Sequence, residues 1–149
     1  MILQSLFSLI ASLCFGIIFN IKGKKLIFAG IGGGLSWFTY SLCLNFRFST
    51  LSSLLVSSII FSIYSEILAR LLKTPVTTII IPALIPLVPG YGMYYTMYQA
   101  ITGDINQSVT TCLNTISSAG TLAIGVILVS SVFRQLNKKH EGKLKIKKI

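Results

Sequence analysis

Apolar runs long enough to cross a lipid bilayer recur along the chain, separated by short polar turns. A helix rises about 1.5 Å per residue, so about 20 apolar residues span the hydrocarbon core. The pattern therefore predicts an all-α, polytopic membrane protein with about five transmembrane helices in a single bundle over residues 1–133, followed by a basic tail over residues 134–149. The expected spans cover residues 2–19, 26–44, 51–69, 76–101 and 108–133.

The first run has the length of a retained helix or of a cleaved signal peptide. A signal peptide begins with positive charge and ends in small residues. Here no Lys or Arg precedes Lys22, and the run ends in Ile17, Ile18 and Phe19. These features favour a retained first helix.

The fourth run is interrupted by prolines. Pro82, Pro86 and Pro89 lie within it, and Gly90 follows the last of them. Each proline removes a backbone donor and costs roughly 3 kcal/mol inside an ordinary helix. The Pro89-Gly90 pair falls near the middle of the span, where unpaired backbone groups are tolerated only if they face protein or trapped water. We therefore expect a helix break at mid-membrane, lined by a binding cavity.

Such a break suits a zwitterionic ligand. A carboxylate is stabilised by the free amides and positive dipole end of the second half-helix, and a cation by the carbonyls of the first. Tyr91 and Tyr94 follow on one helical face, where they either line a substrate path or act as interfacial aromatics. Asn114 on the last span is a candidate partner, or else a structural contact between helices.

Composition and charge agree with a membrane protein. The chain has 149 residues, of which 53% are hydrophobic and 11% charged, well below the charged share of a soluble domain. Its net charge of +10 lies in the turns and the tail rather than on a folded basic face, so no nucleic-acid partner is expected. Twelve of the 13 basic residues fall on one side of a five-span arrangement, with only Arg47 opposite. This predicts a cell-membrane protein with its N-terminus outside and its tail cytoplasmic.

Catalytic and metal-binding patterns are not evident, so we expect neither an enzyme nor a cofactor. The single histidine is His140 in the tail, and no Ser or Cys has a candidate base within its own span. Glu66 is the one acid inside a span, and such acids are candidate functional groups. Arg70 lies four residues later, which favours an interfacial ion pair over a proton-coupling site.

The run Ile85-Pro86-Leu87-Val88-Pro89-Gly90, with Tyr94 after it and a Gly/Ser-rich final helix that ends in basic residues, resembles the threonine/serine exporter (ThrE-type) family. In particular it looks like the small subunit of the two-component form, which corresponds to the C-terminal half of the fused exporter. The resemblance implies export of small hydroxy amino acids, or of dicarboxylates in some members, and a larger membrane partner. By match to the motif, Pro86, Pro89, Gly90 and Tyr94 carry over as site residues.

The expected function is therefore a subunit of a secondary exporter of small carboxylate-bearing metabolites, with threonine or serine favoured and succinate-like dicarboxylates next. The alternative is an accessory subunit that stabilises or regulates a transporting partner without binding substrate. The expected partner is the larger membrane subunit, which would supply the acid for proton coupling, and a homo-oligomer is the second choice.

Overall fold

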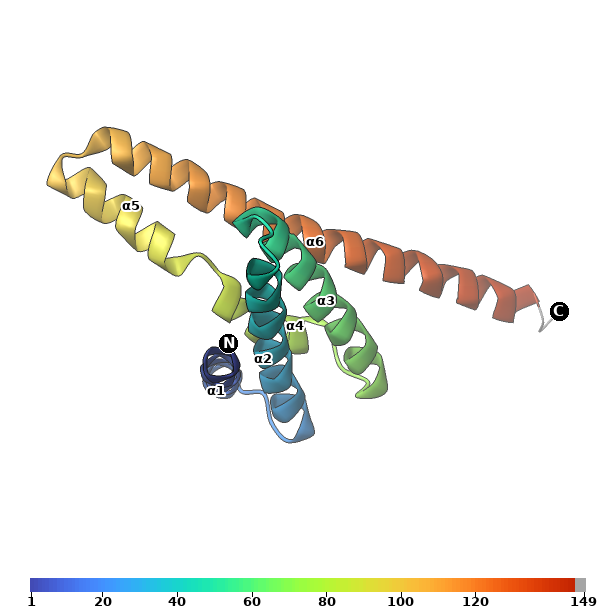
Figure 1. Ribbon diagram of the computed structural model, residues 1–149. Coiled ribbons are helices and arrows are strands. Elements are labelled where there is room, and N and C mark those ends of the chain that lie inside the picture. Colours follow the sequence, from blue (N-terminus) through green and yellow to red (C-terminus); the bar gives the residue numbers. More distant parts are fainter. Residues whose placement is uncertain (147–149) are drawn as a thin grey trace.

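The chain folds into helices joined by short turns (Figure 1). The computed structural model describes residues 1–146, with side chains as far as Leu136, and contains no strand within that part. The elements are α1 (Ile2–Ile18), α2 (Lys24–Asn45), α3 (Thr50–Leu71), α4 (Thr77–Leu84), the short 3-10 helix η1 (Ile85–Leu87), α5 (Gly90–Thr102) and α6 (Ile105–Ile146). The predicted all-α class is confirmed.

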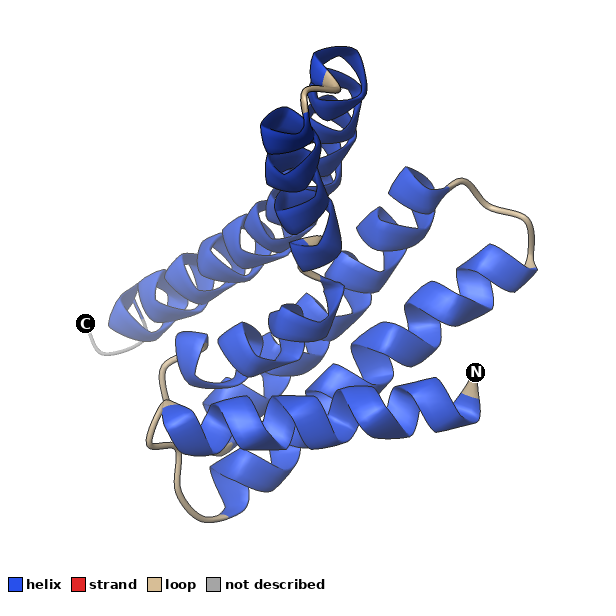
Figure 2. Ribbon diagram, turned by 90° about the vertical axis from the view of Figure 1, so that its left-hand side faces the viewer, coloured by secondary structure: helices blue, strands red, loops and turns tan. Residues whose placement is uncertain are grey.

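Two parts make up the molecule. Helices α1 to α4 form a bundle in which α2 packs against α1, α3 and α4. Helix α5 packs mainly against the first half of α6, and the two form a hairpin that projects away from the bundle (Figures 1 and 2). The middle of α6 crosses α3 and packs against it. The α5–α6 hairpin therefore has far less protein around it than α2 or α3.

Small residues allow the helices of the bundle to approach closely. A methyl group added at Gly30 would meet the Leu13 side chain of α1, and one at Gly34 would lie 3.4 Å from the Ser5 carbonyl oxygen. On the other side of the bundle, Gly125 of α6 lies directly against Ser58 of α3. Close packing through small residues is the usual basis of helix association in lipid. The glycines of α2 therefore form a packing surface for the neighbouring helix.

Three of the helices end in the same way. The second residue after α1, α2 and α3 adopts a left-handed conformation, with φ of 58° at Asn20, 62° at Arg47 and 47° at Lys73. After α3, the Lys73 amide donates to the Arg70 carbonyl and the next amide donates to the Ala69 carbonyl, which is the Schellman pattern. Basic side chains at two of these ends also complement the negative end of the helix dipole. These caps produce the short turns that the sequence pattern requires.

Length and hydropathy mark α2, α3 and the Ile105–Leu136 part of α6 as candidate membrane spans, and the bent pair Thr77–Leu87 and Gly90–Thr102 as a fourth. Helix α1 is apolar but has only 17 residues. The count of five spans and the division at residue 133 therefore stay predictions. Helix α6 also continues to Ile146, so most of the basic tail extends the last helix instead of following it as a separate segment.

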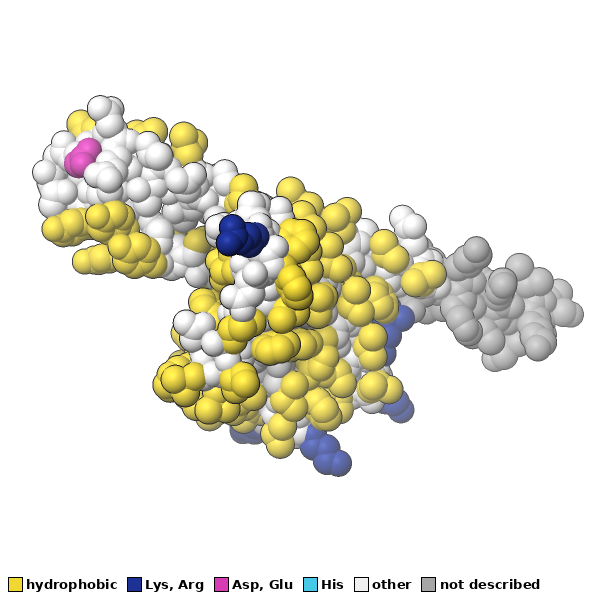
Figure 3. Space-filling model, viewed as in Figure 1, with side chains coloured by type: hydrophobic (Ala, Val, Ile, Leu, Met, Phe, Trp, Pro, Cys, Tyr) yellow, Lys and Arg dark blue, Asp and Glu magenta, His cyan; other side chains and the backbone are white. Residues whose placement is uncertain are grey.

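Apolar side chains cover the bundle between its two ends (Figure 3). Basic side chains gather at the end where the α1–α2 and α3–α4 turns lie, and the α2–α3 turn with Arg47 lies at the opposite end. This arrangement is typical of a bundle whose middle faces lipid and whose ends face water.

Candidate functional site

The predicted helix break is present and has a defined geometry. The Thr77–Leu87 and Gly90–Thr102 segments meet at an angle of 51°. At the corner, the Gly90 amide donates to the Val88 carbonyl at 2.7 Å, across Pro89 with φ −75° and ψ 57°. These values describe an inverse γ-turn. Five residues, which include Pro86 and Pro89, therefore separate the end of α4 from the start of α5.

The carbonyls that the break releases find partners in the bundle. The Val88 amide donates to the Ile85 carbonyl at 3.2 Å, in place of the amide that Pro89 lacks. The Ser36 hydroxyl of α2 is shared between two acceptors. It lies 3.0 Å from the Ala83 carbonyl oxygen and 2.8 Å from the Gly33 carbonyl oxygen. The break is therefore held by a fixed contact with α2. Helix α4 continues through Pro82, and the backbone leaves the α-helical conformation only after Leu84.

The cavity at the break is apolar. It has a volume of about 300 Å³ and lies between the corner and α6. Its lining consists of Leu84, Val88 and Pro89 from the corner and Ala119, Leu122, Ala123, Val126 and Ile127 from α6. Pro86 faces away from it, toward Trp37 and α1. This cavity offers contact to an aliphatic group but no side-chain partner for a charged one.

The structure does not bring the other residues of the predicted substrate path to this cavity. Tyr91 is 74% exposed and Tyr94 is 67% exposed on α5, and Asn114 is exposed on α6. The tyrosine rings stack along the helix, with 5.3 Å between the ring centroids of Tyr91 and Tyr95. The role of Tyr91, Tyr94 and Asn114 in substrate transfer stays a prediction.

Polar contacts that the sequence analysis missed hold the α5–α6 hairpin together. Gln99 is the one buried residue of α5, and its side-chain oxygen accepts a hydrogen bond from Thr111 at 2.8 Å. The Ser108 hydroxyl donates to the Thr96 carbonyl at 2.9 Å. Gln99 stands alone as a long polar side chain within an apolar run, and that isolation was the signal available in the sequence.

Glu66 and Arg70 form an ion pair at the end of α3, with 3.5 Å between Glu66 Oε2 and Arg70 Nη2. The Glu66 side chain is buried. Arg70 also reaches α6, where it donates to the Phe133 carbonyl at 3.3 Å and lies 4.9 Å from the centroid of the Phe133 ring. Within α3, Arg70 therefore neutralises the charge of Glu66, and through Phe133 it also connects α3 to α6.

A cavity of about 390 Å³ opens beside this pair, between α3, the start of α4 and α6. We call it the Glu66 cavity. Its lining residues are Glu66, Arg70, Val76, Thr77, Ile80, Val126, Ser130 and Arg134. No sequence pattern connects Ser130 or Arg134 with Glu66, because only the packing of α6 against α3 places them in one cavity.

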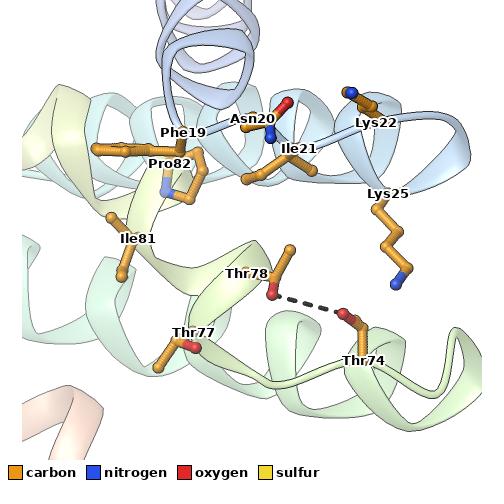
Figure 4. Close-up of a pocket in the computed structure, with 10 residues that line it drawn as sticks. All are labelled: Phe19, Asn20, Ile21, Lys22, Lys25, Thr74, Thr77, Thr78, Ile81 and Pro82. Atoms are coloured by element: carbon orange, nitrogen blue, oxygen red, sulfur yellow. Dashed lines mark hydrogen bonds between the residues drawn. The ribbon is translucent and has the colours of Figure 1, made fainter.

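A second polar cavity, of about 520 Å³, lies on the other side of α4, where the α1–α2 and α3–α4 turns meet (Figure 4). Lys25 points across it toward Thr74, whereas Lys22 points away. The Thr74 hydroxyl donates to the Thr78 hydroxyl at 3.4 Å. Thr77 lines both this cavity and the Glu66 cavity, so the start of α4 separates two polar spaces at the basic end of the bundle.

The chain was compared with protein families, curated proteins and solved structures. The profile of the family described as "Threonine/Serine exporter, ThrE" matches residues 4–132, which include the break, the hairpin and most of the Glu66 cavity. No curated protein and no solved structure matches the chain. Since the match covers most of the sequence and the helices are those of a membrane protein, the chain belongs to the threonine/serine exporter (ThrE) family.

Proposed function

We propose that this protein is one subunit of a secondary exporter of small carboxylate-bearing metabolites, with threonine or serine as the first choice and dicarboxylates such as succinate as the second. Family membership supports a role in export. The observation that carries the proposal is the break between α4 and α5, which lies inside the matched region and interrupts an apolar span. Discontinuous helices of this kind surround the substrate in many secondary transporters.

The start of α5 has the chemistry that a carboxylate requires. No side chain caps its first turn, and no acidic residue lies there. The first amides of a helix carry the positive end of the dipole and bind anions well. A methyl group built on Gly90 would meet no atom within 4 Å, so the backbone is open to a ligand at this point.

The surface of the α5–α6 hairpin supports a larger membrane subunit as the partner. Thr110, Asn114 and Ser117 of α6 are exposed, and so are Tyr91 and Tyr94 of α5. An asparagine that faces lipid leaves its amide without hydrogen bonds, so such residues usually face another helix. A partner that packs on this hairpin would cover them. A second copy of the chain is the alternative occupant.

One observation favours the alternative function, an accessory subunit that supports a transporting partner without binding substrate. The cavity at the break is lined by apolar side chains, and the partner could supply every polar contact to the substrate. The two functions differ in what a substitution at the break changes. In a substrate-binding subunit, a substitution at the break changes the substrate concentration at half-maximal export. In an accessory subunit, the same substitution changes only the amount of assembled complex.

Export from intact cells tests the proposal. Cells with and without the gene are loaded with labelled threonine, serine or succinate, and efflux is followed over time. We expect loss of the gene to slow efflux of threonine or serine, and the wild-type gene on a plasmid to restore it. Equal efflux of all three metabolites from both strains would contradict the proposed function.

A further inference from the structure

The Glu66 cavity combines charges of both signs with hydroxyl groups and an apolar wall. Glu66 contributes a carboxylate, Arg70 and Arg134 contribute guanidinium groups, and Thr77 and Ser130 contribute hydroxyls. Glu66 itself is only 7% exposed. Acids buried in a membrane bundle are expensive, because ionised groups lose their hydration there, and they usually face a partner or a functional cavity.

The two arginines are held differently. Arg70 is fixed by Phe133 and by Oε2 of Glu66. Arg134 is exposed and forms no ion pair with the part of the chain whose side chains are described. Arg70 contacts Glu66 through Oε2, so the other carboxylate oxygen, Oε1, is not part of this ion pair. The cavity therefore presents one acceptor oxygen on α3 and one guanidinium on α6.

We propose that the Glu66 cavity binds the zwitterionic head group of a small amino acid, an inference that rests on the proposed export function. Glu66 accepts hydrogen bonds from the ammonium group, and Arg134 binds the carboxylate in the planar geometry that guanidinium favours. Thr77 and Ser130 provide hydroxyls for a side-chain hydroxyl of the ligand. The volume of 390 Å³ lies within the usual range of small-ligand sites, about 300–1,000 Å³.

The position of this cavity fits the first step of export. It lies at the end of α3 that precedes the basic α3–α4 turn, on the side that the charge distribution assigns to the cytoplasm. Val126 lines both this cavity and the apolar cavity at the break. The two cavities therefore adjoin at Val126, and a ligand bound by Glu66 and Arg134 lies in the space next to the apolar cavity at the break.

Protection from thiol labelling tests the site in the assembled protein. Ser130→Cys is introduced into the full chain after Cys14, Cys43 and Cys112 are replaced by alanine, and membranes are treated with a small charged thiol reagent. Threonine at ten times its dissociation constant should slow the labelling about tenfold, because only the unoccupied site reacts. Gln135→Cys, also on α6 but outside the lining, is the matched control and should label at the same rate with and without threonine.

Two analogues of threonine and two variants of the protein test the roles of Glu66 and Arg134 separately. We compare threonine with 3-hydroxybutyrate, which lacks the ammonium group, and with the corresponding amino alcohol, which lacks the carboxylate. In the native site threonine should protect best. Glu66→Gln should remove the advantage of threonine over 3-hydroxybutyrate, and Arg134→Gln should remove its advantage over the amino alcohol. Lys73→Gln removes a nearby positive charge outside the cavity and should change neither comparison.

The outcomes distinguish this inference from the proposed function. If loss of the gene abolishes threonine efflux but threonine does not protect Ser130→Cys, the export function stands and the binding site is wrong. Equal protection by all three ligands, or full protection in both charge variants, also overturns the site. If loss of the gene leaves efflux unchanged, the proposed function itself is wrong.

Discussion

Single small residues determine how closely the helices of the bundle approach, and their surroundings differ enough to predict opposite effects for the same substitution. A methyl group on Gly33 would overlap the Ser12 side chain and lie 3.3 Å from the Ser8 carbonyl oxygen of α1. One on Gly120 of α6 would meet nothing within 4 Å. The two glycines therefore form a matched pair.

We expect Gly33→Ala to destabilise the bundle by about 1–3 kcal/mol, because the backbone of α1 must move away. Gly120→Ala should leave stability unchanged or raise it by about 0.5–1 kcal/mol, since alanine restricts the unfolded chain more than glycine does. Thermal unfolding of the two variants in the same detergent compares these effects. Equal losses would show that α1 does not lie as close to Gly33 as the structure places it.

Some of these residue contacts were visible in the sequence and others were not. The four-residue spacing of Gly30 and Gly34 is a sequence pattern typical of close helix packing, although it does not identify the partner helix. The presence of Glu66 and Arg134 in one cavity depends on how α6 crosses α3, and no local sequence pattern contains that crossing. The outward orientation of Tyr91 likewise depends on a projecting hairpin rather than on helical periodicity.

At the scale of whole elements, the break between α4 and α5 is the feature that the sequence predicted best. Proline and glycine act through the local backbone, so their effect on the helix does not depend on tertiary contacts. The supporting hydrogen bond from Ser36 to the Ala83 carbonyl was not predictable, because it joins residues from α2 and α4. Helix α6 continues to Ile146, past the predicted boundary at residue 133, because a run of charges does not by itself end a helix, and the basic tail stays a prediction.

Replacing Pro89 by Ala and Gly90 by Leu should straighten the 51° corner into a continuous helix. Each new residue has a helical backbone preference, and a Cβ atom at position 90 would meet no atom within 4 Å. We expect normal abundance in the membrane but loss of export. Pro82→Ala is the matched control, because α4 already continues through Pro82, and it should keep export. Normal export by the double variant would show that the corner only shapes the packing.

At the scale of the molecule, the two basic turns lie at one end of the bundle and Arg47 at the other, as the charge count requires. The turns after α1 and α3 meet around one cavity, so they cannot lie on opposite sides of a membrane. The two turns therefore lie on the same side of a membrane, and the prediction that this side is the cytoplasm rests on the charge count alone.

Cysteine labelling in intact cells tests this orientation. A membrane-impermeant thiol reagent should reach a cysteine introduced for Arg47 in the α2–α3 turn or for Asn106 at the hairpin tip. It should reach one introduced for Lys22 or Lys73 only after the cells are opened. The reverse pattern would place the N-terminus inside, and labelling of Arg47 and Asn106 from different sides would remove one span from the five-span arrangement.

The last prediction concerns whether this chain transports by itself. The α5–α6 hairpin leaves Asn114 and the outer faces of Tyr91 and Tyr94 without covering protein, and secondary transporters usually build their path between two bundles that move against each other. Glu66, the acid within a predicted span, is held in an ion pair with Arg70, so we expect the partner to supply the acid for proton coupling.

We therefore expect the purified chain, reconstituted alone in liposomes with an imposed proton gradient, to show no threonine or succinate flux above empty liposomes. Reconstitution with the larger subunit of the same exporter should produce flux, and the co-purified complex should contain both chains. The Asn114→Leu variant, produced together with the larger subunit, tests the role of the hairpin. If the variant folds normally but no longer co-purifies with the larger subunit, the partner binds that face of the hairpin. Rapid proton-driven flux from the wild-type chain alone would overturn the two-subunit proposal and favour an assembly of identical copies.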